Sequence, residues 1–207
     1  MAFDKIPELK PLGCKAIAYM RDKKYKVRAL NIIYFEGMDT DLVTVNSDKI
    51  DGWNDVRSII TDDGDVLLAC QATTGPGKYY TYNRLNPDGA FIITLGQHLD
   101  CWQLGKHHQQ DALVQCGILS GSRDNNEDGL RTGDIVYYGD DFGVNQHTTG
   151  NAGSSDSPEV VGRWSAGCLV GRYSATHYNV FMPIVRSMGL KTFDSTIISG
   201  KDFQKFC

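Results

Sequence analysis

The chain has 207 residues, of which 41% are hydrophobic and 22% charged, and its formal net charge is −4. These values are typical of a folded globular protein and exclude disordered chains, collagen-like repeats and coiled coils. The longest basic cluster spans only Lys23 to Arg28, and no stretch approaches the ~20 apolar residues that a membrane span needs. We therefore expect neither a nucleic-acid partner nor a membrane span.

The chain is expected to form one domain over residues 1–207. Residues 1–25 are predicted to be an N-terminal arm, extended over its first fifteen residues, and about 66–199 to be the core. Short β-rich runs separated by turns, together with two or three helices, indicate a β-rich α+β fold.

The predicted elements alternate with turns rich in glycine, proline, asparagine and aspartate. Apolar spacing predicts a short helix over 51–61 and a second helix over 174–188, which Pro183 should bend. The strands predicted from β-branched and aromatic runs are 27–36, 66–72, 79–82, 90–95, 134–138, 142–147 and 192–199.

Six cysteines are scattered along the chain, and the spacing excludes a CxxC zinc or redox pair. The stretch from Met1 to Glu8 contains acids and a proline where a signal peptide has an apolar run. We therefore expect synthesis in the cytoplasm without an export signal, with most of the thiols reduced there.

A histidine and a cysteine stand out in the segment 142–170. His147 ends a predicted strand, and Cys168 follows Ser165-Ala166-Gly167. Because a free thiol is only a few per cent thiolate at neutral pH, a catalytic cysteine needs a neighbouring base. The pattern predicts Cys168 as a nucleophile and His147 as its base. The alternative is a buried small cysteine beside a strand-end histidine without chemistry.

The pattern His147-x-x-Gly150 followed by Ser165-x-Gly167-Cys168 resembles the active-site signature of L,D-transpeptidases, the YkuD-like family. The segment 72–80 (ATTGPGKYY) resembles the family's upstream hairpin. Three further elements are similar to those of phage peptidoglycan-lysis proteins, namely Trp102-x-x-Gly-x-His107, Arg123-Asp-x-Asn-x-Asp128 and Asn145-x-His147. The resemblance implies an L,D-transpeptidase-like mixed sheet or sandwich with a few short helices.

The resemblance also implies roles for individual residues. Cys168 would attack a peptide carbonyl in a peptidoglycan stem or cross-link, and His147 would take the thiol proton and return it to the leaving amine. The Gly143 carbonyl would orient the histidine ring, and Ser165 and Gly167 would shape an oxyanion loop. The residues expected to contact the substrate are Arg163, Arg172, His107 and Trp102.

The chain departs from the family pattern near the cysteine. Ala166 stands where the family has histidine or arginine, and Val170 stands where it has arginine. The implied function is a peptidoglycan-cleaving cysteine enzyme of the phage endolysin type. It would reach the cell wall with the help of a membrane-permeabilising partner. An L,D-transpeptidase proper and a non-catalytic wall-binding virion or baseplate protein are the alternatives.

The acidic segment Asp124-x-Asn126-x-Asp128-Gly129 matches the first half of a calcium loop, so these two acids and the amide are candidate calcium ligands. Position 12 of such a loop requires glutamate, and Ile135 stands there. A solvated turn explains the composition better. His98, His107 and His108 lack the spacing of a zinc-peptidase motif. We therefore expect no metal and no cofactor.

Overall fold

The computed structural model describes residues 3–207, and strands make up most of its regular structure. The strands are β1 Leu30–Glu36, β2 Asp55–Thr61, β3 Val66–Thr73, β4 Ala90–Ile93, β5 Gly96–His107, β6 Gln110–Gln115, β7 Leu119–Asp124, β8 Val136–Gly139, β9 Gln146–Thr148, β10 Leu169–Gly171 and β11 Phe193–Ser199. The helices are α1 Lys10–Asp22, α2 Lys78–Tyr82, α3 Ser174–Thr176, α4 Met182–Ser187 and α5 Gly200–Lys205, with a 3-10 turn η1 Pro7–Leu9 and a π-helical turn η2 His177–Phe181.

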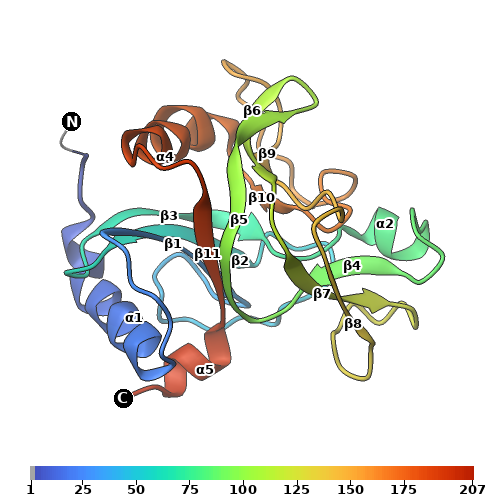
Figure 1. Ribbon diagram of the computed structural model, residues 1–207, viewed down its shortest axis with the longest axis horizontal. Coiled ribbons are helices and arrows are strands. Elements are labelled where there is room, and N and C mark those ends of the chain that lie inside the picture. The colour runs from blue at the N-terminus through green and yellow to red at the C-terminus, as the bar shows by residue number, and fades with distance from the viewer. Residues whose placement is uncertain (1–2) are drawn as a thin grey trace.

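Eight of the strands close into a barrel in the order β1-β11-β5-β6-β9-β10-β3-β2, and β4, β7 and β8 form a three-stranded sheet beside it (Figure 1). The β1–β11 and β9–β10 pairs are parallel, whereas pairs such as β1–β2 and β5–β6 are antiparallel. The expected β-rich fold with a mixed sheet and short helices is confirmed. The mixed sheet closes on itself instead of dividing into the two layers of a sandwich.

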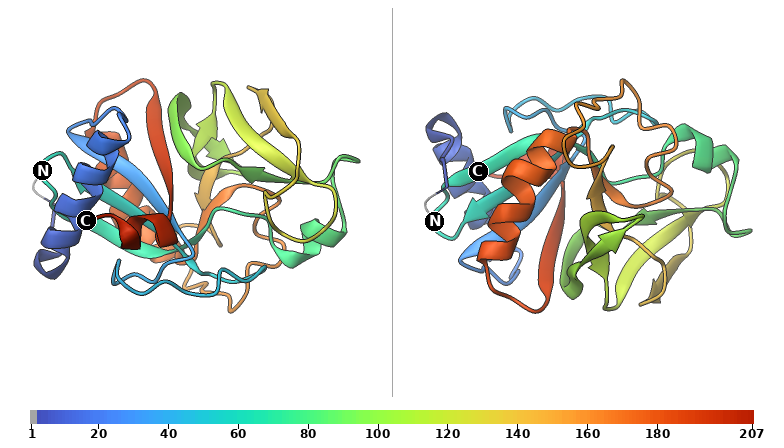
Figure 2. Two further views of the ribbon diagram at one scale, coloured as in Figure 1. Left: turned by 90° about the horizontal axis from the view of Figure 1, so that it is seen from below. Right: turned by 90° about the horizontal axis from the view of Figure 1, so that it is seen from above.

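The middle of strand β1, residues 32–35, is apolar because both of its faces are covered. Ile33 and Phe35 pack in the same core cluster as α1, whereas Ile32 and Tyr34 pack in the cluster of α4. The two opposite views of Figure 2 show α1 in front of these strands in one and α4 in front of them in the other. A strand covered on both faces loses the polar alternation of a half-exposed strand.

The N-terminal arm predicted for residues 1–25 is wrong over most of its length, because Lys10–Asp22 form α1. Pro11 lies in the first turn of the helix, where its missing N–H costs no hydrogen bond. Gly13 is needed for packing, since a Cβ there would lie 2.1 Å from the carbonyl oxygen of Gly64. Both residue types are disfavoured in helix interiors. Residues 1 and 2 lie outside the described residues.

Two further predicted elements have the wrong type. Residues 55–61 form strand β2, not a helix, and all but the last of them are buried. Val56, Ile59 and Ile60 have helical spacing, and because the polar Asp55, Arg57 and Ser58 are buried as well, the strand has no regular alternation of apolar and polar residues. Residues 78–82 form the short helix α2, not a strand. Strands β5, β6, β7 and β10 and helix α5 were not predicted. In β5 the reason is that much of the strand is polar and exposed.

The predicted helix over 174–188 is present as the continuous run α3, η2 and α4. Pro183 lies in the first turn of α4, directly after the π-helical turn. Proline lacks the N–H that an α-helix needs, and the wider turn before it accommodates that loss.

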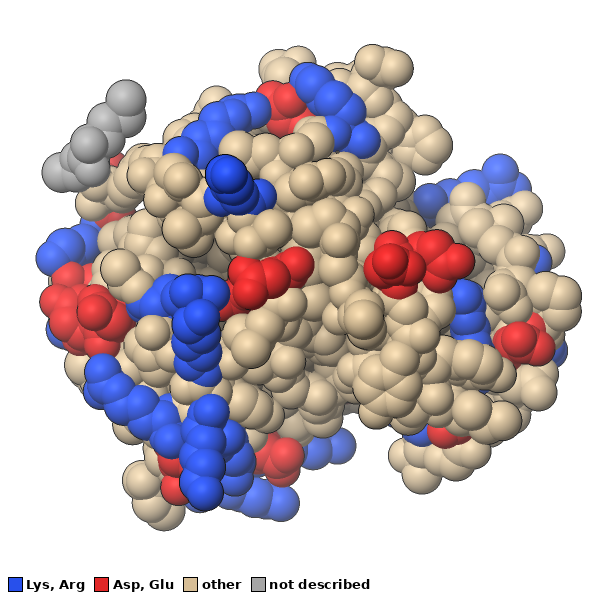
Figure 3. Space-filling view, in the orientation of Figure 1, with Lys and Arg blue, Asp and Glu red and all other residues tan. Residues whose placement is uncertain are grey.

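Charged side chains are distributed in small groups. On the face shown in Figure 3, lysines and arginines are interspersed with aspartates and glutamates, and much of the area is uncharged. Within residues 3–207, none of the helices combines the length and apolar character required to cross a bilayer.

Candidate functional site

A cavity of about 630 Å³ lies between the barrel and the small sheet, and both Cys168 and His147 line it. Phe91 of β4 and Arg123 of β7 line the side of the small sheet. His107, at the end of β5, lines the barrel side. This volume is in the range of pockets that hold small ligands or short peptide segments.

Parallel pairing of β9 with β10 places the cysteine beside the histidine. Leu169 is aligned with Gln146 and Val170 with His147. Cys168 immediately precedes β10, so its side chain is brought to the start of β9 although the two residues are far apart in the sequence.

The half-buried Cys168 thiol has two backbone contacts. The Asn145 N–H donates to Sγ at 3.4 Å, and the thiol faces the Gly143 carbonyl oxygen at 3.6 Å. Burial raises the pKa of Cys168 above its ordinary value, and the Asn145 hydrogen bond opposes this only in part. The free protein therefore holds a neutral thiol at neutral pH.

His147 is 3% exposed and is held in one tautomer. Its Nδ1 lies 3.0 Å from the Thr148 carbonyl oxygen, which can only accept, so Nδ1 carries the proton. Its Nε2 has no protein partner in the part of the chain described. Burial, followed by the neighbouring His107, lowers the pKa of His147 to about 3. A neutral imidazole thus keeps an unused lone pair on Nε2.

A buried arginine contacts the backbone of His147. Arg57 is fully buried and donates from Nη1 to the His147 carbonyl oxygen at 3.2 Å. The same nitrogen lies 3.3 Å from Nδ1 of His177, and the guanidinium carbon lies 4.1 Å from the ring centroid of Phe181. Burial and then the charge of Arg57 lower the pKa of His177 to about 3. Neither Arg57 nor His177 was predicted as a site residue, since neither belongs to a recognisable motif.

His107 stacks on His147, with ring centroids 4.1 Å apart and planes at 23°. One ring nitrogen of each histidine and the Cys168 sulfur lie within 4.8 Å of one another. Two histidines and a cysteine are ligand types that zinc accepts. The Nδ1 atom of His107, however, lies 2.9 Å from the Asn145 amide nitrogen and accepts its hydrogen bond. Because His107 Nδ1 and His147 Nδ1 are engaged, a metal could be held only through His107 Nε2, His147 Nε2 and Cys168 Sγ.

Ser165 organises the loop that precedes the cysteine. Its hydroxyl lies 2.9 Å from the Gly75 carbonyl oxygen and 2.8 Å from the Cys168 carbonyl oxygen, and it accepts from the Gly167 N–H at 3.1 Å. Gly167 has φ +129°, and a Cβ there would lie 2.7 Å from the Phe91 carbonyl oxygen. Only glycine fits this position.

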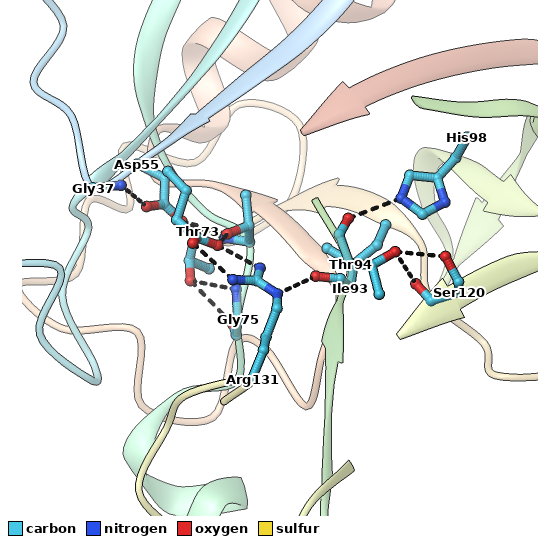
Figure 4. A network of polar contacts seen from close by, with 11 residues as sticks. Gly37, Asp55, Thr73, Gly75, Ile93, Thr94, His98, Ser120 and Arg131 are labelled. Atoms are coloured by element: carbon cyan, nitrogen blue, oxygen red, sulfur yellow. Dashed lines mark hydrogen bonds and ion pairs between the residues drawn. The ribbon is translucent and has the colours of Figure 1, made fainter. Parts of the chain in front are cut away.

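A polar network holds the end of β3, which lies next to the loop that precedes Cys168 (Figure 4). Asp55 accepts from the N–H of Thr74 at 2.6 Å and lies 2.8 Å from its hydroxyl. Arg131 forms a two-pronged pair with Glu36, whose Oε1 lies 2.7 Å from Nη1. These contacts fix the end of β3 next to the site.

Two of the residues predicted to contact substrate do not line the cavity. Trp102 is fully buried in the core, and its indole donates to the Val144 carbonyl oxygen at 3.0 Å. Arg172 donates to the Pro158 carbonyl oxygen at 3.0 Å and to Gln71 Oε1 at 2.8 Å, so its guanidinium is committed to loop contacts. Both predictions are corrected to structural roles, because their polar atoms already have protein partners.

The remaining predicted residues lie at the site with some changes of role. His107 and Arg163 line the cavity. Arg163 is exposed and stacks over the Tyr79 ring at 3.8 Å from its centroid. The carbonyl that orients His147 belongs to Thr148, not to Gly143 as expected, and the Gly143 carbonyl contacts the thiol instead.

The candidate calcium loop bonds to itself. Asp124 accepts from the N–H groups of Asp128 and Gly129 at 3.1 and 2.9 Å, and Asn126 donates to Asp128 at 2.8 Å. Asp128 also accepts from the Leu130 N–H at 2.7 Å. These contacts are typical of an aspartate- and asparagine-rich turn.

The chain matches no protein-family model, no curated protein and no solved structure. Cys168, His147, His107 and Asn145 therefore stand as a candidate site on their geometry and on the motifs in which they occur.

Proposed function

We propose that the protein is a cysteine-dependent peptidoglycan peptidase with an L,D-transpeptidase-like catalytic arrangement, similar to phage endolysins. The observation that carries the proposal is the buried Nε2 of His147, which has no partner among the described residues, on a ring that has a nitrogen within 4.8 Å of the Cys168 sulfur, both residues lining an open cavity. Leaving a buried polar atom without a hydrogen-bond partner costs free energy. Such an atom at a cavity next to a cysteine therefore supports a role for His147 as the base in catalysis.

The chemistry begins from the neutral pair. As Sγ of Cys168 forms a bond to the carbonyl carbon of the substrate, its proton moves to Nε2 of His147. The amide C–N bond then breaks, and His147 returns the proton to the leaving amine. The product is a thioester on Cys168. Water gives a proton to the same Nε2 as its oxygen forms a bond to the thioester carbon. The C–S bond then breaks, His147 returns the proton to the Cys168 sulfur, and the acid product is released.

The charge of the cavity favours an anionic peptide. Arg123 and Arg163 line it, and among the described residues no carboxylate does. Both guanidinium groups lie near aromatic rings, with Arg123 5.6 Å from the Phe142 centroid and Arg163 over Tyr79. Stem peptides of peptidoglycan carry the carboxylates that such arginines bind.

The test is digestion of purified peptidoglycan sacculi, with the products identified by mass spectrometry. Wild-type protein should release peptide fragments, and Cys168→Ala should release none while keeping its melting temperature. Cys207→Ala is the matched control, because this exposed thiol lies outside the site, and it should digest at the wild-type rate.

Three outcomes separate the alternatives. Digestion by Cys168→Ala at the wild-type rate contradicts the proposal. Products joined to an added acceptor amine, in place of hydrolysed ends, indicate a transpeptidase. Saturable binding to sacculi without products indicates a non-catalytic wall-binding protein.

A further inference from the structure

The side chain of Asn145 fixes which nitrogen of His107 carries the proton. Its Oδ1 accepts from the backbone N–H of Gln115 at 3.0 Å. Since a backbone N–H can only donate, the amide orientation is determined, and its NH₂ group faces His107. That NH₂ lies 2.9 Å from Nδ1 of His107 and donates to it. A neutral His107 must therefore carry its proton on Nε2.

The two stacked histidines thus have opposite tautomers. His147 has its proton on Nδ1 and a lone pair on Nε2, whereas His107 has a lone pair on Nδ1 and its proton on Nε2. Burial, followed by the nearby His108, lowers the pKa of His107, which keeps its ring neutral. Within residues 3–207 no protein group accepts from His107 Nε2, and the ring lines the cavity. One ring offers an acceptor and the other a donor.

An acyl-transfer site needs donors for the carbonyl oxygen that becomes negative. The Gly167 N–H is engaged by Ser165 Oγ, whereas the Cys168 N–H has no acceptor within residues 3–207. Such sites commonly supply more than one donor. A second donor is therefore expected from outside the loop.

We propose that His107 is a catalytic residue that donates its Nε2–H hydrogen bond to the carbonyl oxygen of the scissile amide, with Asn145 as the positioning residue that sets its tautomer. This inference rests on the proposed cysteine chemistry. His107 keeps its proton throughout, while His147 carries the transferred proton from the thiol to the leaving amine.

The tautomers can be measured without any substrate. Nitrogen-15 and proton correlation spectra of the histidine rings should show the proton of His107 on Nε2 and that of His147 on Nδ1. In Asn145→Asp, a carboxylate oxygen can accept from His107 Nδ1, so the proton should appear on Nδ1. Observation of the Nδ1–H form of His107 in the wild-type protein overturns the proposal, as does an unchanged tautomer in Asn145→Asp.

The kinetic test uses acylation of Cys168 by para-nitrophenyl acetate, measured against Cys168→Ala. This probe reports on the oxyanion donors whether or not peptidoglycan is the natural substrate. His107→Leu should lower the acylation rate by about 100-fold, the usual effect of removing one oxyanion donor. His107→Gln, whose amide places an N–H near the Nε2 position, should recover at least about tenfold. A rate for His107→Leu within about threefold of wild type overturns the proposal.

The outcomes distinguish this inference from the proposed function. If the wild-type protein does not digest sacculi but the acylation rates and tautomers are as expected, only the proposed substrate is contradicted. Acylation that is independent of Cys168 removes the nucleophile and with it both proposals. If His107→Leu does not fold, His107→Gln and Asn145→Asp still decide, because Asn145→Asp should lower acylation by about 100-fold.

Discussion

Lowering the pH should destabilise the protein through His177, which contacts the same buried arginine as His147. The neutral ring accepts from Arg57 at Nδ1 and donates from Nε2 to the Asp111 carbonyl oxygen at 2.8 Å. A protonated ring would be buried next to a guanidinium charge. Burial first, and Arg57 second, lower the pKa of His177 from 6.5 to about 3.

The sign and size of the effect follow from these two pKa values. Below pH 6.5 the unfolded chain binds a proton at His177, whereas the folded chain does not until about pH 3. The stabilisation is therefore fully present above pH 6.5 and is lost as the pH falls. Between about pH 8 and about pH 5 the loss amounts to about 2 kcal/mol, at ~1.4 kcal/mol per pH unit.

Urea unfolding of wild-type protein and His177→Gln at both pH values isolates this contribution, since all other titrating groups are common to the two proteins. Between the higher and the lower pH, the wild-type protein should lose about 2 kcal/mol more unfolding free energy than His177→Gln. His108→Gln is the control, because this side chain is exposed, and it should follow wild type. A pH-independent difference for His177→Gln would refute the reasoning.

Three further outcomes are expected. Alkylation of Cys168 by iodoacetamide should accelerate with pH around a midpoint above that of free cysteine, because burial raises its pKa, and a midpoint near neutrality would contradict this. Gly171→Ala should lower the unfolding free energy by about 1–3 kcal/mol in urea, since its Cβ would lie 2.0 Å from Arg57 Nη2. Gly75→Ala, with no atom within 4 Å, should change it by less than about 0.5 kcal/mol, and equal losses would contradict the packing. Trp102→Phe should lower the unfolding free energy by about 2 kcal/mol, because a buried hydrogen bond is lost, and an unchanged melting temperature would count against it.

Prediction from sequence succeeded where the local pattern and the tertiary setting agree. The apolar runs of β1, β3, β4 and β11 gave strands close to their observed bounds. The run 51–61 was assigned to a helix because a strand that is buried on both faces has no alternation to read. The first helix was missed because Pro11 and Gly13, both disfavoured in helix interiors, have reasons for being there that only packing reveals.

The candidate site shows the same division. The spacing of His147 and the Ser165-Ala166-Gly167-Cys168 segment was enough to select the two residues on which the proposed chemistry depends. The assignment of Trp102 and Arg172 to substrate contact failed because a motif records that a residue is present and not whether its polar atoms are already bonded. Asn145 carried no independent signal, since its importance lies in contacts with β5 and β6.

The sequence by itself determined a folded, β-rich chain and selected the histidine and cysteine of the candidate site, because composition, β-rich runs and motif spacing are local properties. Only the tertiary structure decided that the sheet closes into a barrel and that β9 and β10 pair in parallel. It also decided that two histidines stack with opposite tautomers next to Cys168. The physical reason is that burial and hydrogen-bond partners determine protonation and tautomer. Both come from residues that are distant in the sequence and adjacent only after folding.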